Sequence, residues 1–314
     1  MGDAAAIFPG QGSQVVGMGR DVSESDTRVK KVFDLANEVV GFDLARLCFD
    51  GPAEELERTD IQQPAVFVTS VAIWTAFIEG GGRRNHFTRM AGLSLGEYTA
   101  LHVAGALTFE DALRLVCRRG ELMQQAALAA PSGMVSLIGA DEASAKALCD
   151  HARGEDVLGP ANFNCPGQIV ISGSKAACER AVSLAAEFGC RGVSLPVAGA
   201  FHSPLMEPAA AGLWEMLVRT PFSPPQVPVI ANVDGQYHQD APSLRESLRR
   251  QLTQPVLWQR CMERLMEEGV DRFVEIGPGR VLTGLIRKIN RKAEALSLNA
   301  AGSVAGAIAQ LNGG

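Results

Sequence analysis

The sequence predicts an α/β protein with a largely parallel sheet, interrupted by a small second unit. Short apolar runs that end in glycine-rich turns alternate with longer segments whose apolar residues recur at helical spacing, which is the pattern of strands joined by crossover helices. Residues 130–198 carry a strand–helix–strand–helix–strand pattern of their own, which predicts a compact ferredoxin-like insert. We therefore expect a large subdomain formed by residues 1–129 and 199–314, with the insert between its two parts.

Composition and charge restrict the functional class. The chain has 314 residues, of which 46% are hydrophobic and 20% are charged, so it can bury a substantial core. A net charge of −6 disfavours a nucleic-acid-binding protein. The seven cysteines are odd in number and form no C-x-x-C pair, so neither disulfides nor a metal site is expected. Residues 1–14 lack the features of a secretory signal, and a reducing cytoplasmic setting is therefore expected.

The elements before the insert follow from apolar spacing and turn residues. Residues 4–8 form a buried strand that stops at the glycine-rich segment Pro9–Gly12. The longest apolar stretch, residues 65–78, is too short to span a bilayer, so a buried helix is expected and no membrane segment. Thr108 and Asp111 carry the capping-box signature at the start of another helix. The other expected elements are helices at 26–40 and 97–104 and a short strand ending at 89–91.

The rest of the chain continues the alternation of strands and helices. The insert is expected to contain strands at 134–138, 169–172 and 192–197 and helices at 142–152 and 175–188. After the insert, the expected helices are 205–218, 243–252 and 281–290, and the expected strands are 227–232 and 272–276. This alternation is the reason to expect parallel pairing in the large subdomain.

The most informative short motif is Gly92-Leu-Ser-Leu-Gly96, a G-x-S-x-G sequence with Ser94 at its centre. A short strand precedes it and a helix follows it, which is the context of a nucleophile elbow, a sharp turn that lifts the serine hydroxyl clear of the backbone. The two glycines permit the tight turn and the close approach of neighbouring backbone. The competing interpretation is a glycine-rich turn that holds an unreactive serine.

Two further residues are functional candidates, a base that such a serine requires and a buried charge. His202 is the best candidate base, because it lies in a loop directly after a predicted strand, where functional residues concentrate. Arg119 lies on or beside the apolar stripe of the helix that starts after Thr108, where a charge is costly unless it is paired. Its planar guanidinium suits a carboxylate. Arg119 therefore either pairs with an internal Asp or Glu or binds an acidic ligand.

Seven short motifs occur together in one known family. They are Phe8-Pro-Gly-Gln-Gly-Ser-Gln14, Gly92-Leu-Ser-Leu-Gly-Glu-Tyr98, Arg119-Gly-Glu-Leu-Met123, Asn162-Phe-Asn-Cys-Pro-Gly-Gln168, Gly199-Ala-Phe-His202, Gln251-Leu252 before Pro255-Val256, and Glu275-Ile-Gly-Pro-Gly279. Together they closely resemble malonyl-CoA:acyl carrier protein transacylases, the acyltransferases of fatty acid and polyketide synthesis. The match runs in order from about Ala4 to Asn290. The resemblance implies an α/β-hydrolase-like large subdomain.

The resemblance also assigns roles to the residues that match. It implies that Ser94 is the nucleophile and that His202 is its general base and acid. It implies that Arg119 binds the free carboxylate of the malonyl group. The backbone N–H groups of Gln11 and Leu95 are similar to the oxyanion hole, in agreement with the rule that the residue after the nucleophile supplies one donor.

Three residues around this centre bear on orientation and specificity. The resemblance implies that the side chain or backbone carbonyl of Gln251 orients His202, so that no triad carboxylate is required. It implies that the bulk of Phe201 disfavours an α-methyl branch on the substrate. Leu93 departs from the family, which usually has histidine before the nucleophile. This is either a tolerated packing change or the mark of an altered pocket with a different acyl preference.

The implied reaction is ping-pong transfer of a malonyl group from malonyl-CoA to the phosphopantetheine thiol of acyl carrier protein, with no metal or redox cofactor. Transfer of another acyl group, or hydrolysis of acyl groups on carrier proteins, would use the same serine and histidine. A carrier-docking module without activity is the non-enzymatic alternative. The sequence leaves open whether the carrier serves fatty acid or polyketide synthesis. We expect a monomer that binds neither nucleic acid nor membranes.

Acyl carrier proteins are usually acidic, so a basic docking patch is expected. Two basic clusters are candidates, one at the end of the last predicted helix and one just before Gln251. The first can also be explained as a solvated helix end whose charges complement the helix dipole. The clusters are Arg287, Lys288, Arg291 and Lys292, and Arg249 and Arg250.

Overall fold

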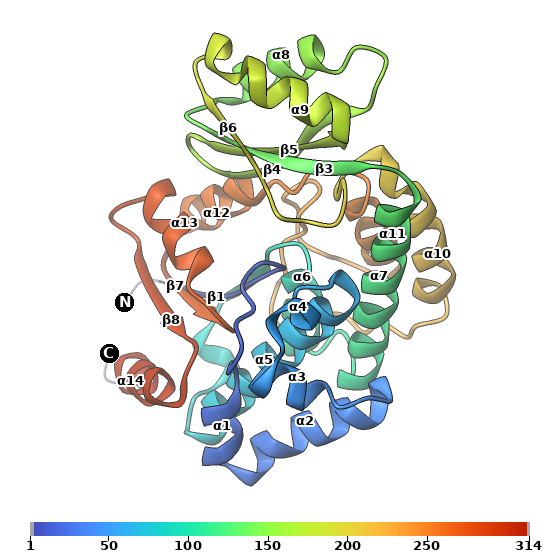
Figure 1. The fold of residues 1–314 in the computed structure, drawn as a ribbon. Helices are drawn as coiled ribbons and strands as arrows, with labels where there is room; N and C mark the ends of the chain where they lie inside the picture. Colours follow the sequence, from blue (N-terminus) through green and yellow to red (C-terminus); the bar gives the residue numbers. More distant parts are fainter. Residues whose placement is uncertain (1–2, 313–314) are drawn as a thin grey trace.

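The computed structural model describes residues 3–312 and shows two subdomains, each built on its own four-stranded sheet (Figure 1). The large subdomain contains a parallel sheet, and the small subdomain, at the top of Figure 1, contains an antiparallel one. The predicted α/β class with a ferredoxin-like insert is therefore confirmed. The boundaries placed at residues 130 and 198 stay a prediction.

The parallel sheet is assembled from both ends of the chain. Its strands, in spatial order, are β2 (Arg89–Gly92), β1 (Asp3–Phe8), β7 (Val270–Ile276) and β8 (Glu294–Leu298). Ile7 on β1 is level with Ala91 on one side and Glu275 on the other. Phe8 pairs with Gly92 at the carboxyl ends of β1 and β2. The loop after Phe8 therefore lies beside the turn after Gly92.

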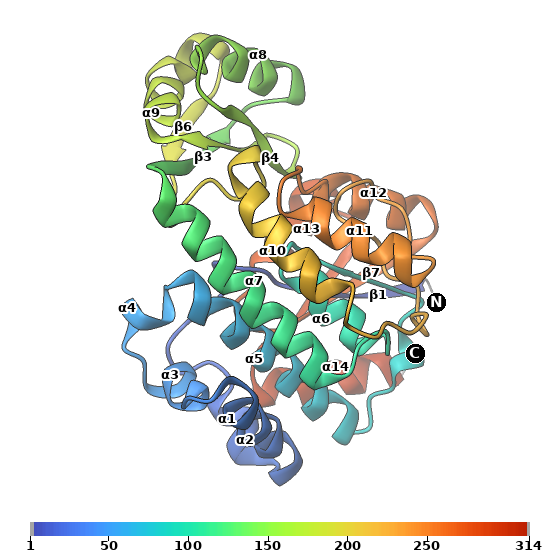
Figure 2. The same ribbon diagram turned by 90° about the vertical axis from the view of Figure 1, so that its right-hand side faces the viewer.

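Helices surround this sheet on both faces. They are α1 (Arg20–Ser25), α2 (Thr27–Val40), α3 (Leu44–Asp50), α4 (Ala53–Leu56), α5 (Thr59–Glu79), α6 (Gly96–Val103), α7 (Phe109–Ala129), α10 (Glu207–Leu217), α11 (Ala241–Gln251), α12 (Trp258–Glu267), α13 (Val281–Ile289) and α14 (Ala301–Asn312). Figure 2 shows α7 running along the large subdomain until its C-terminal end reaches the small one.

Alternate residues of β1 enter two different cores. Ala6 and Phe8 belong to the core that contains α5 and α6, whereas Ala5 and Ile7 belong to the core that contains α12 and α13. A parallel sheet covered on both faces requires strands that are apolar throughout. This requirement explains why β1 reads as a continuous apolar run in the sequence.

The helix α5 is apolar on nearly all sides. With 21 residues it is long and apolar enough to cross a membrane, so the expectation that it is too short is wrong, but 78% of its most apolar window is buried inside the fold. A helix that is hydrophobic all round suits the centre of a large core. It begins at Thr59, earlier than the apolar stretch alone suggests, and includes Pro64 within its first two turns.

The small subdomain has the order β-α-β-β-α-β. Its elements are β3 (Ser132–Ile138), α8 (Glu142–Ala152), β4 (Leu158–Cys165), β5 (Gln168–Ser174), α9 (Lys175–Leu184) and β6 (Arg191–Ser194). The strands pair antiparallel in the spatial order β4-β5-β3-β6, which is the ferredoxin-like arrangement. The sequence pattern missed β4, because Pro160, Asn162 and Asn164 interrupt its apolar residues.

The chain enters and leaves the small subdomain at neighbouring points. The N–H of Ala200 donates to Ser132 Oγ at 3.2 Å. A Cβ atom added to Gly199 would lie 2.5 Å from Ala127 Cβ, so the two crossing segments pack directly against each other. Gly199 is required here by the close approach of the two segments.

Three local expectations need correction. Residues 227–232 form no strand; Val229 makes only an isolated pairing with Met90, and the neighbouring Pro228 has no N–H to extend it. The strand β6 ends at Ser194 rather than at 197. Thr108 Oγ1 caps α7 by accepting from the N–H of Asp111 at 3.1 Å, but Asp111 accepts from the Thr108 hydroxyl and the capping box is incomplete.

Candidate active site

The turn between β2 and α6 has the geometry of a nucleophile elbow. Ser94 has φ = 52°, a conformation that costs energy for a non-glycine residue. A Cβ atom on Gly92 would overlap the backbone of Gly96, and one on Gly96 would overlap the carbonyl of Phe8. Both glycines of the motif are therefore needed for the turn to pack against β1. The interpretation of this motif as an ordinary turn does not account for the strained serine.

His202 faces the serine. Its Nε2 lies 2.9 Å from Ser94 Oγ, and its Nδ1 lies 2.6 Å from the backbone carbonyl of Gln251. Since a carbonyl can only accept, Nδ1 carries the proton and Nε2 is free to accept from the serine hydroxyl. His202 is itself in a strained conformation, with φ = 57°. Within residues 3–312 these two are the only non-glycine residues with positive φ.

The environment of His202 favours its neutral form. Burial is the main cause that lowers its pKa to about 4, the positive charge of Arg119 lowers it further, and the hydrogen bond to Gln251 opposes both. At neutral pH the imidazole is therefore uncharged. An uncharged imidazole whose free nitrogen faces Ser94 Oγ can act as a general base.

Arg119 is buried with neutral partners only. Its side chain donates to Gln63 Oε1 at 2.6 Å, Ser94 Oγ at 2.8 Å and Gln251 Oε1 at 3.0 Å. The ion pairs found among residues 3–312 include none with Arg119. Of the two alternatives from the sequence, an internal carboxylate partner is thus not observed. The buried Glu97 carboxylate acts on the guanidinium electrostatically but is joined to it only through Gln251. A buried cation without a carboxylate in direct contact favours an anionic ligand.

The two predicted oxyanion donors lie in the loop after β1 and at the start of α6, and their role stays a prediction. Gln11 follows β1, and Leu95 is the residue that precedes α6, next to Ser94. Among the described residues, the backbone N–H groups of Gln11 and Leu95 donate to no protein acceptor. The N-terminal end of a helix carries partial positive charge, which suits a developing anion beside Ser94.

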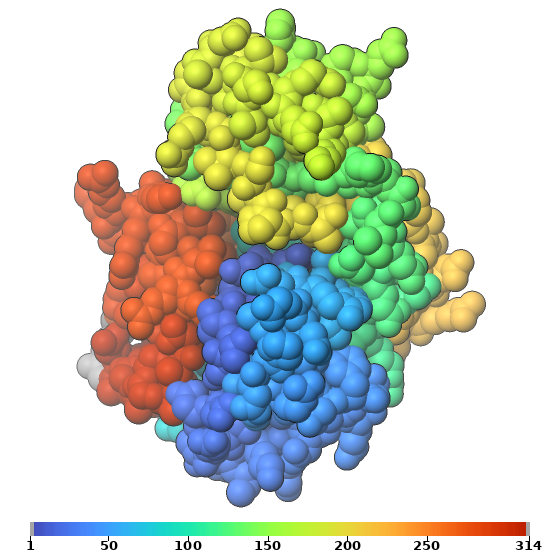
Figure 3. Space-filling model, viewed as in Figure 1, coloured from blue at the N-terminus to red at the C-terminus, as the bar shows by residue number. Residues whose placement is uncertain are grey.

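A cavity of about 200 Å³ opens in front of Ser94, between the two subdomains. Gln11, Leu93, Phe201 and His202 line it together with Ser94. Arg119, Leu95 and Gln251 are buried and are not among its lining residues. Figure 3 shows the small subdomain, the C-terminal part and the N-terminal part meeting at a notch in the surface. The other lining residues are Met123, Met134, Asn162, Asn164, Gln168, Val170, Leu195, Val197, Val281 and Leu285.

Leu93 forms an apolar wall beside the nucleophile. It packs against the core that contains α12 and α13 and also against Gly10, since a Cβ atom on Gly10 would lie 3.3 Å from Leu93 Cδ2. Its side chain is therefore both a packing group and part of the cavity lining. Its effect on acyl preference stays a prediction.

Sequence reasoning missed the residue that fixes the elbow from behind. Asn232 Oδ1 accepts the N–H of Ser94 at 2.6 Å, and Asn232 Nδ2 donates to the carbonyl of Gly92 at 2.8 Å. Asn232 is fully buried. In sequence it stands 138 residues from Ser94, before an Asp-Gly turn, and no local pattern signals the contact.

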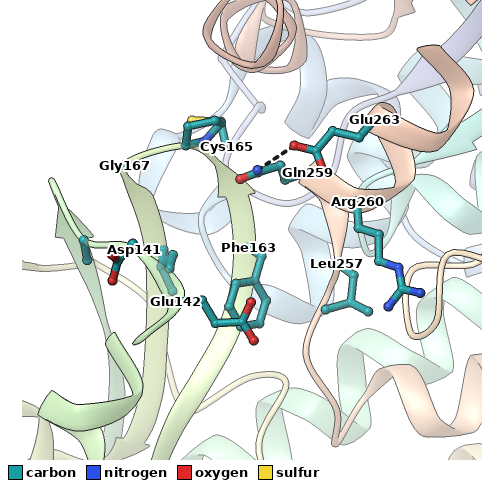
Figure 4. A pocket seen from close by; sticks show the side chains of 12 residues that line it. Asp141, Glu142, Phe163, Cys165, Gly167, Leu257, Gln259, Arg260 and Glu263 are labelled. Carbon is teal, nitrogen blue, oxygen red and sulfur yellow. Dashed lines mark hydrogen bonds between the residues drawn. The ribbon is translucent and has the colours of Figure 1, made fainter. Parts of the chain in front are cut away.

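A second cavity lies between β4, the start of α8 and α12, and has a volume of about 480 Å³ (Figure 4). Glu142, Arg260 and Glu263 line it, and Gln259 Nε2 donates to Glu263 Oε1 at 2.7 Å. Its one thiol is that of Cys165, whose pKa burial raises. This raised pKa keeps the thiol protonated, so Cys165 is not an activated nucleophile.

This chain is similar to known acyltransferases over nearly its whole length. The model of the acyl transferase domain family matches residues 6–307. Malonyl CoA-acyl carrier protein transacylase of Salmonella typhimurium is 43% identical over 98% of this chain and 99% of its own length. The corresponding protein of Bacillus subtilis is 43% identical over 95% and 94% of the two chains.

Solved structures show the same similarity. The malonyl CoA-acyl carrier protein transacylase of Coxiella burnetii has a TM-score of 0.96 and 38% identity, and covers 99% of this chain and 98% of its own. A malonyl-transacylase solved in complex with its type II polyketide synthase acyl-carrier protein has a TM-score of 0.94 and 42% identity, covering 99% and 100%.

Proposed function

This chain belongs to the acyl transferase domain family, and on that premise we propose that it transfers a malonyl group from malonyl-CoA to the phosphopantetheine thiol of an acyl carrier protein. The observation that carries the proposal is the buried guanidinium of Arg119, which touches Ser94 Oγ and has only neutral partners. A malonyl ester on Ser94 would bring a carboxylate to this guanidinium. An acetyl group would leave the buried charge unpaired, which disfavours it.

The first half-reaction acylates Ser94. Neutral His202 takes the hydroxyl proton at Nε2 while Ser94 Oγ attacks the thioester carbonyl of malonyl-CoA. The N–H groups of Gln11 and Leu95 hold the resulting oxyanion. The C–S bond then breaks, the coenzyme A sulfur receives the proton from His202, and a malonyl ester remains on Ser94.

The second half-reaction releases the malonyl group to the carrier. The phosphopantetheine thiol gives its proton to His202 and attacks the ester carbonyl, and the same two N–H groups hold the oxyanion. The bond between the acyl carbon and Ser94 Oγ breaks, and His202 returns the proton to the serine oxygen. The product is a malonyl thioester on the carrier, and no metal or redox cofactor takes part.

Two residues adjust this chemistry. The Gln251 carbonyl holds the Nδ1–H of His202 at 2.6 Å, so that a backbone group takes the place of the carboxylate found in many serine triads. Phe201 is 4% exposed and lines the cavity next to His202. Its bulk supports exclusion of an α-methyl branch from the acyl group.

Carrier docking is proposed at the basic cluster that ends α13. This helix lines the cavity through Val281 and Leu285, so a carrier bound at its C-terminal end would be near the mouth. The other cluster is less available, because Arg249 pairs with Glu246 at 2.7 Å.

We also propose that the protein acts as a monomer in the cytoplasm, as expected from its sequence.

Intact-protein mass spectrometry tests the proposal most directly. Wild type and Ser94→Ala are mixed with malonyl-CoA, acetyl-CoA or methylmalonyl-CoA, and holo carrier protein is then added. A malonyl adduct on wild type alone, which moves to the carrier, is the expected result. Release of free malonate instead of transfer would indicate a hydrolase, labelling by another acyl group would change the substrate, and no adduct with any of them would overturn the acyl-enzyme mechanism.

A further inference from the structure

Glu97 is a buried carboxylate that the proposed mechanism does not use. It lies in the first turn of α6, three residues after Ser94, and is 1% exposed. An acidic residue at this position can complement the positive N-terminal end of a helix. In the structure it points under the elbow instead, where a charge without polar partners would be strongly destabilising.

Both oxygens of this carboxylate are occupied. Oε1 accepts from His238 Nε2 at 2.8 Å, and Oε2 accepts from the backbone N–H of Asn232 at 3.0 Å and from Gln251 Nε2 at 2.8 Å. His238 and Gln251 are buried as well. The four residues form a closed polar network in which each donor faces an acceptor.

Two members of the network hold the reacting groups. Asn232 accepts the N–H of Ser94 through its side chain. Gln251 accepts the Nδ1–H of His202 through its backbone, and its side-chain amide donates to the Ser94 carbonyl at 3.1 Å. The same amide accepts from Arg119. One carboxylate thus fixes the two residues that set the positions of the nucleophile, the base and the guanidinium.

We propose that Glu97, supported by His238, is a positioning residue for acyl transfer, which holds Gln251 and Asn232 so that Ser94, His202 and Arg119 keep their reactive arrangement. The inference rests on the proposed function only through the identity of the acyl group. Glu97 joins Asn232, which precedes α11, to Gln251, the last residue of α11. The two are 19 positions apart, and no hydrogen bond among the described residues joins them directly. Without Glu97, the hydrogen-bond link between Asn232 and Gln251 would run only through Ser94, the residue that the two must hold in place.

Glu97→Gln is the direct test, because it keeps the size of the side chain but replaces one acceptor oxygen by an N–H₂ donor. In one orientation of the amide this donor faces His238, and in the other it faces the donors of Asn232 and Gln251. We expect acylation by malonyl-CoA at saturation to slow about 100-fold while KM changes less than about threefold, since a small misplacement of reacting groups acts on the rate. Reaction with a fluorophosphonate, a general serine-hydroxyl reagent, should slow in parallel.

Glu268→Gln is the matched control. Glu268 also accepts from three side chains, Arg89, Arg264 and Tyr237, and Tyr237 is the chain neighbour of His238, but none of these groups lines the cavity. It should lose thermal stability and keep its acylation rate. Equal losses of rate in both variants, or a Glu97→Gln enzyme as fast as wild type, would overturn the inference.

A second pair of variants covers the case in which Glu97→Gln fails to fold. His238→Gln can still donate to Glu97 Oε1, whereas His238→Phe cannot and leaves that oxygen without a partner. We expect His238→Phe to react about tenfold more slowly than His238→Gln with both reagents. Equal rates would contradict the proposal. A wild type that reacts with the fluorophosphonate but not with malonyl-CoA would overturn the proposed substrate and leave the positioning role standing.

Discussion

Replacing Arg119 by methionine should remove the preference for malonyl over acetyl groups. Methionine fills much of the same volume in this buried site but carries no charge and no donor. In the wild-type protein the guanidinium donates to three neutral acceptors and, among the described residues, to no carboxylate. A malonyl carboxylate is the group that this arrangement lacks.

The size of the effect follows from the contacts. A bidentate carboxylate contact provides two charge-assisted hydrogen bonds of about 1.5–3 kcal/mol each, or about 3–6 kcal/mol together. Binding gives up part of the present hydrogen bonds to Gln63, Ser94 and Gln251, which offsets some of this gain. At about 1.4 kcal/mol for each factor of ten, kcat/KM for malonyl-CoA should fall about 10²- to 10³-fold. Acylation by acetyl-CoA should not fall, because no buried charge is left unpaired.

The assay is single-turnover acylation of Ser94, quenched at set times and read as intact mass, with each acyl-CoA alone and with both in competition. Arg119→Lys serves as the comparison, since it keeps the charge but loses the planar pair of donors, and should lie between wild type and Arg119→Met. If Arg119→Met still chooses malonyl over acetyl by the wild-type ratio, the role assigned to the guanidinium is wrong.

Four further predictions follow from the same geometry. The rate of Ser94 acylation should stay level from neutral pH downward and fall only as pH passes about 4, the lowered pKa of His202 at which its base form is lost. In the unfolded chain His202 has its ordinary pKa of about 6.5, so below that pH the unfolded state binds a proton that the folded state does not. The free energy of unfolding should therefore decrease by up to about 3 kcal/mol from pH 6.5 to pH 4. Denaturant titration of wild type and His202→Ala would show whether this loss occurs. Gly92→Ala places a methyl group on the backbone of Gly96 and should abolish acylation and lower the melting temperature; a variant with wild-type stability and activity would contradict the close packing of the elbow. Phe201→Ala should allow labelling of Ser94 by methylmalonyl-CoA, measured by mass, and unchanged exclusion would show that another side chain rejects the branch.

Strong periodicity made most of the fold predictable. The central elements, β1, α5 and α7, are long or wholly apolar, and the sequence located all three. The helix α12 was also missed, although its buried residues Trp258, Cys261, Met262 and Leu265 recur at helical spacing. Two other missed elements lack such a signal. The strand β8 lies at the sheet edge and is half-buried along most of its length, and α14 consists mainly of small residues.

The candidate site was predictable only where it is local in sequence. The glycines on either side of Ser94 predict a nucleophile elbow, and the position of His202 after a strand predicts a functional residue. Asn232 and the side-chain contacts of Gln251 depend on how segments more than 130 residues apart meet. Such contacts are set by topology and register, which the spacing of apolar residues does not specify.

The crossing between the subdomains has an architectural consequence. Because Gly199 packs against Ala127 and Ala200 bonds to Ser132, the large subdomain is nearly continuous across the place where the other unit is inserted. Chain insertions are best tolerated where their two ends are adjacent. The nucleophile, the base and the guanidinium all belong to the large subdomain. The inserted small subdomain supplies one wall of the acyl cavity, including Met134 and Val170. Exchanging the small subdomain would therefore change the shape of the acyl cavity without moving the nucleophile, the base or the guanidinium.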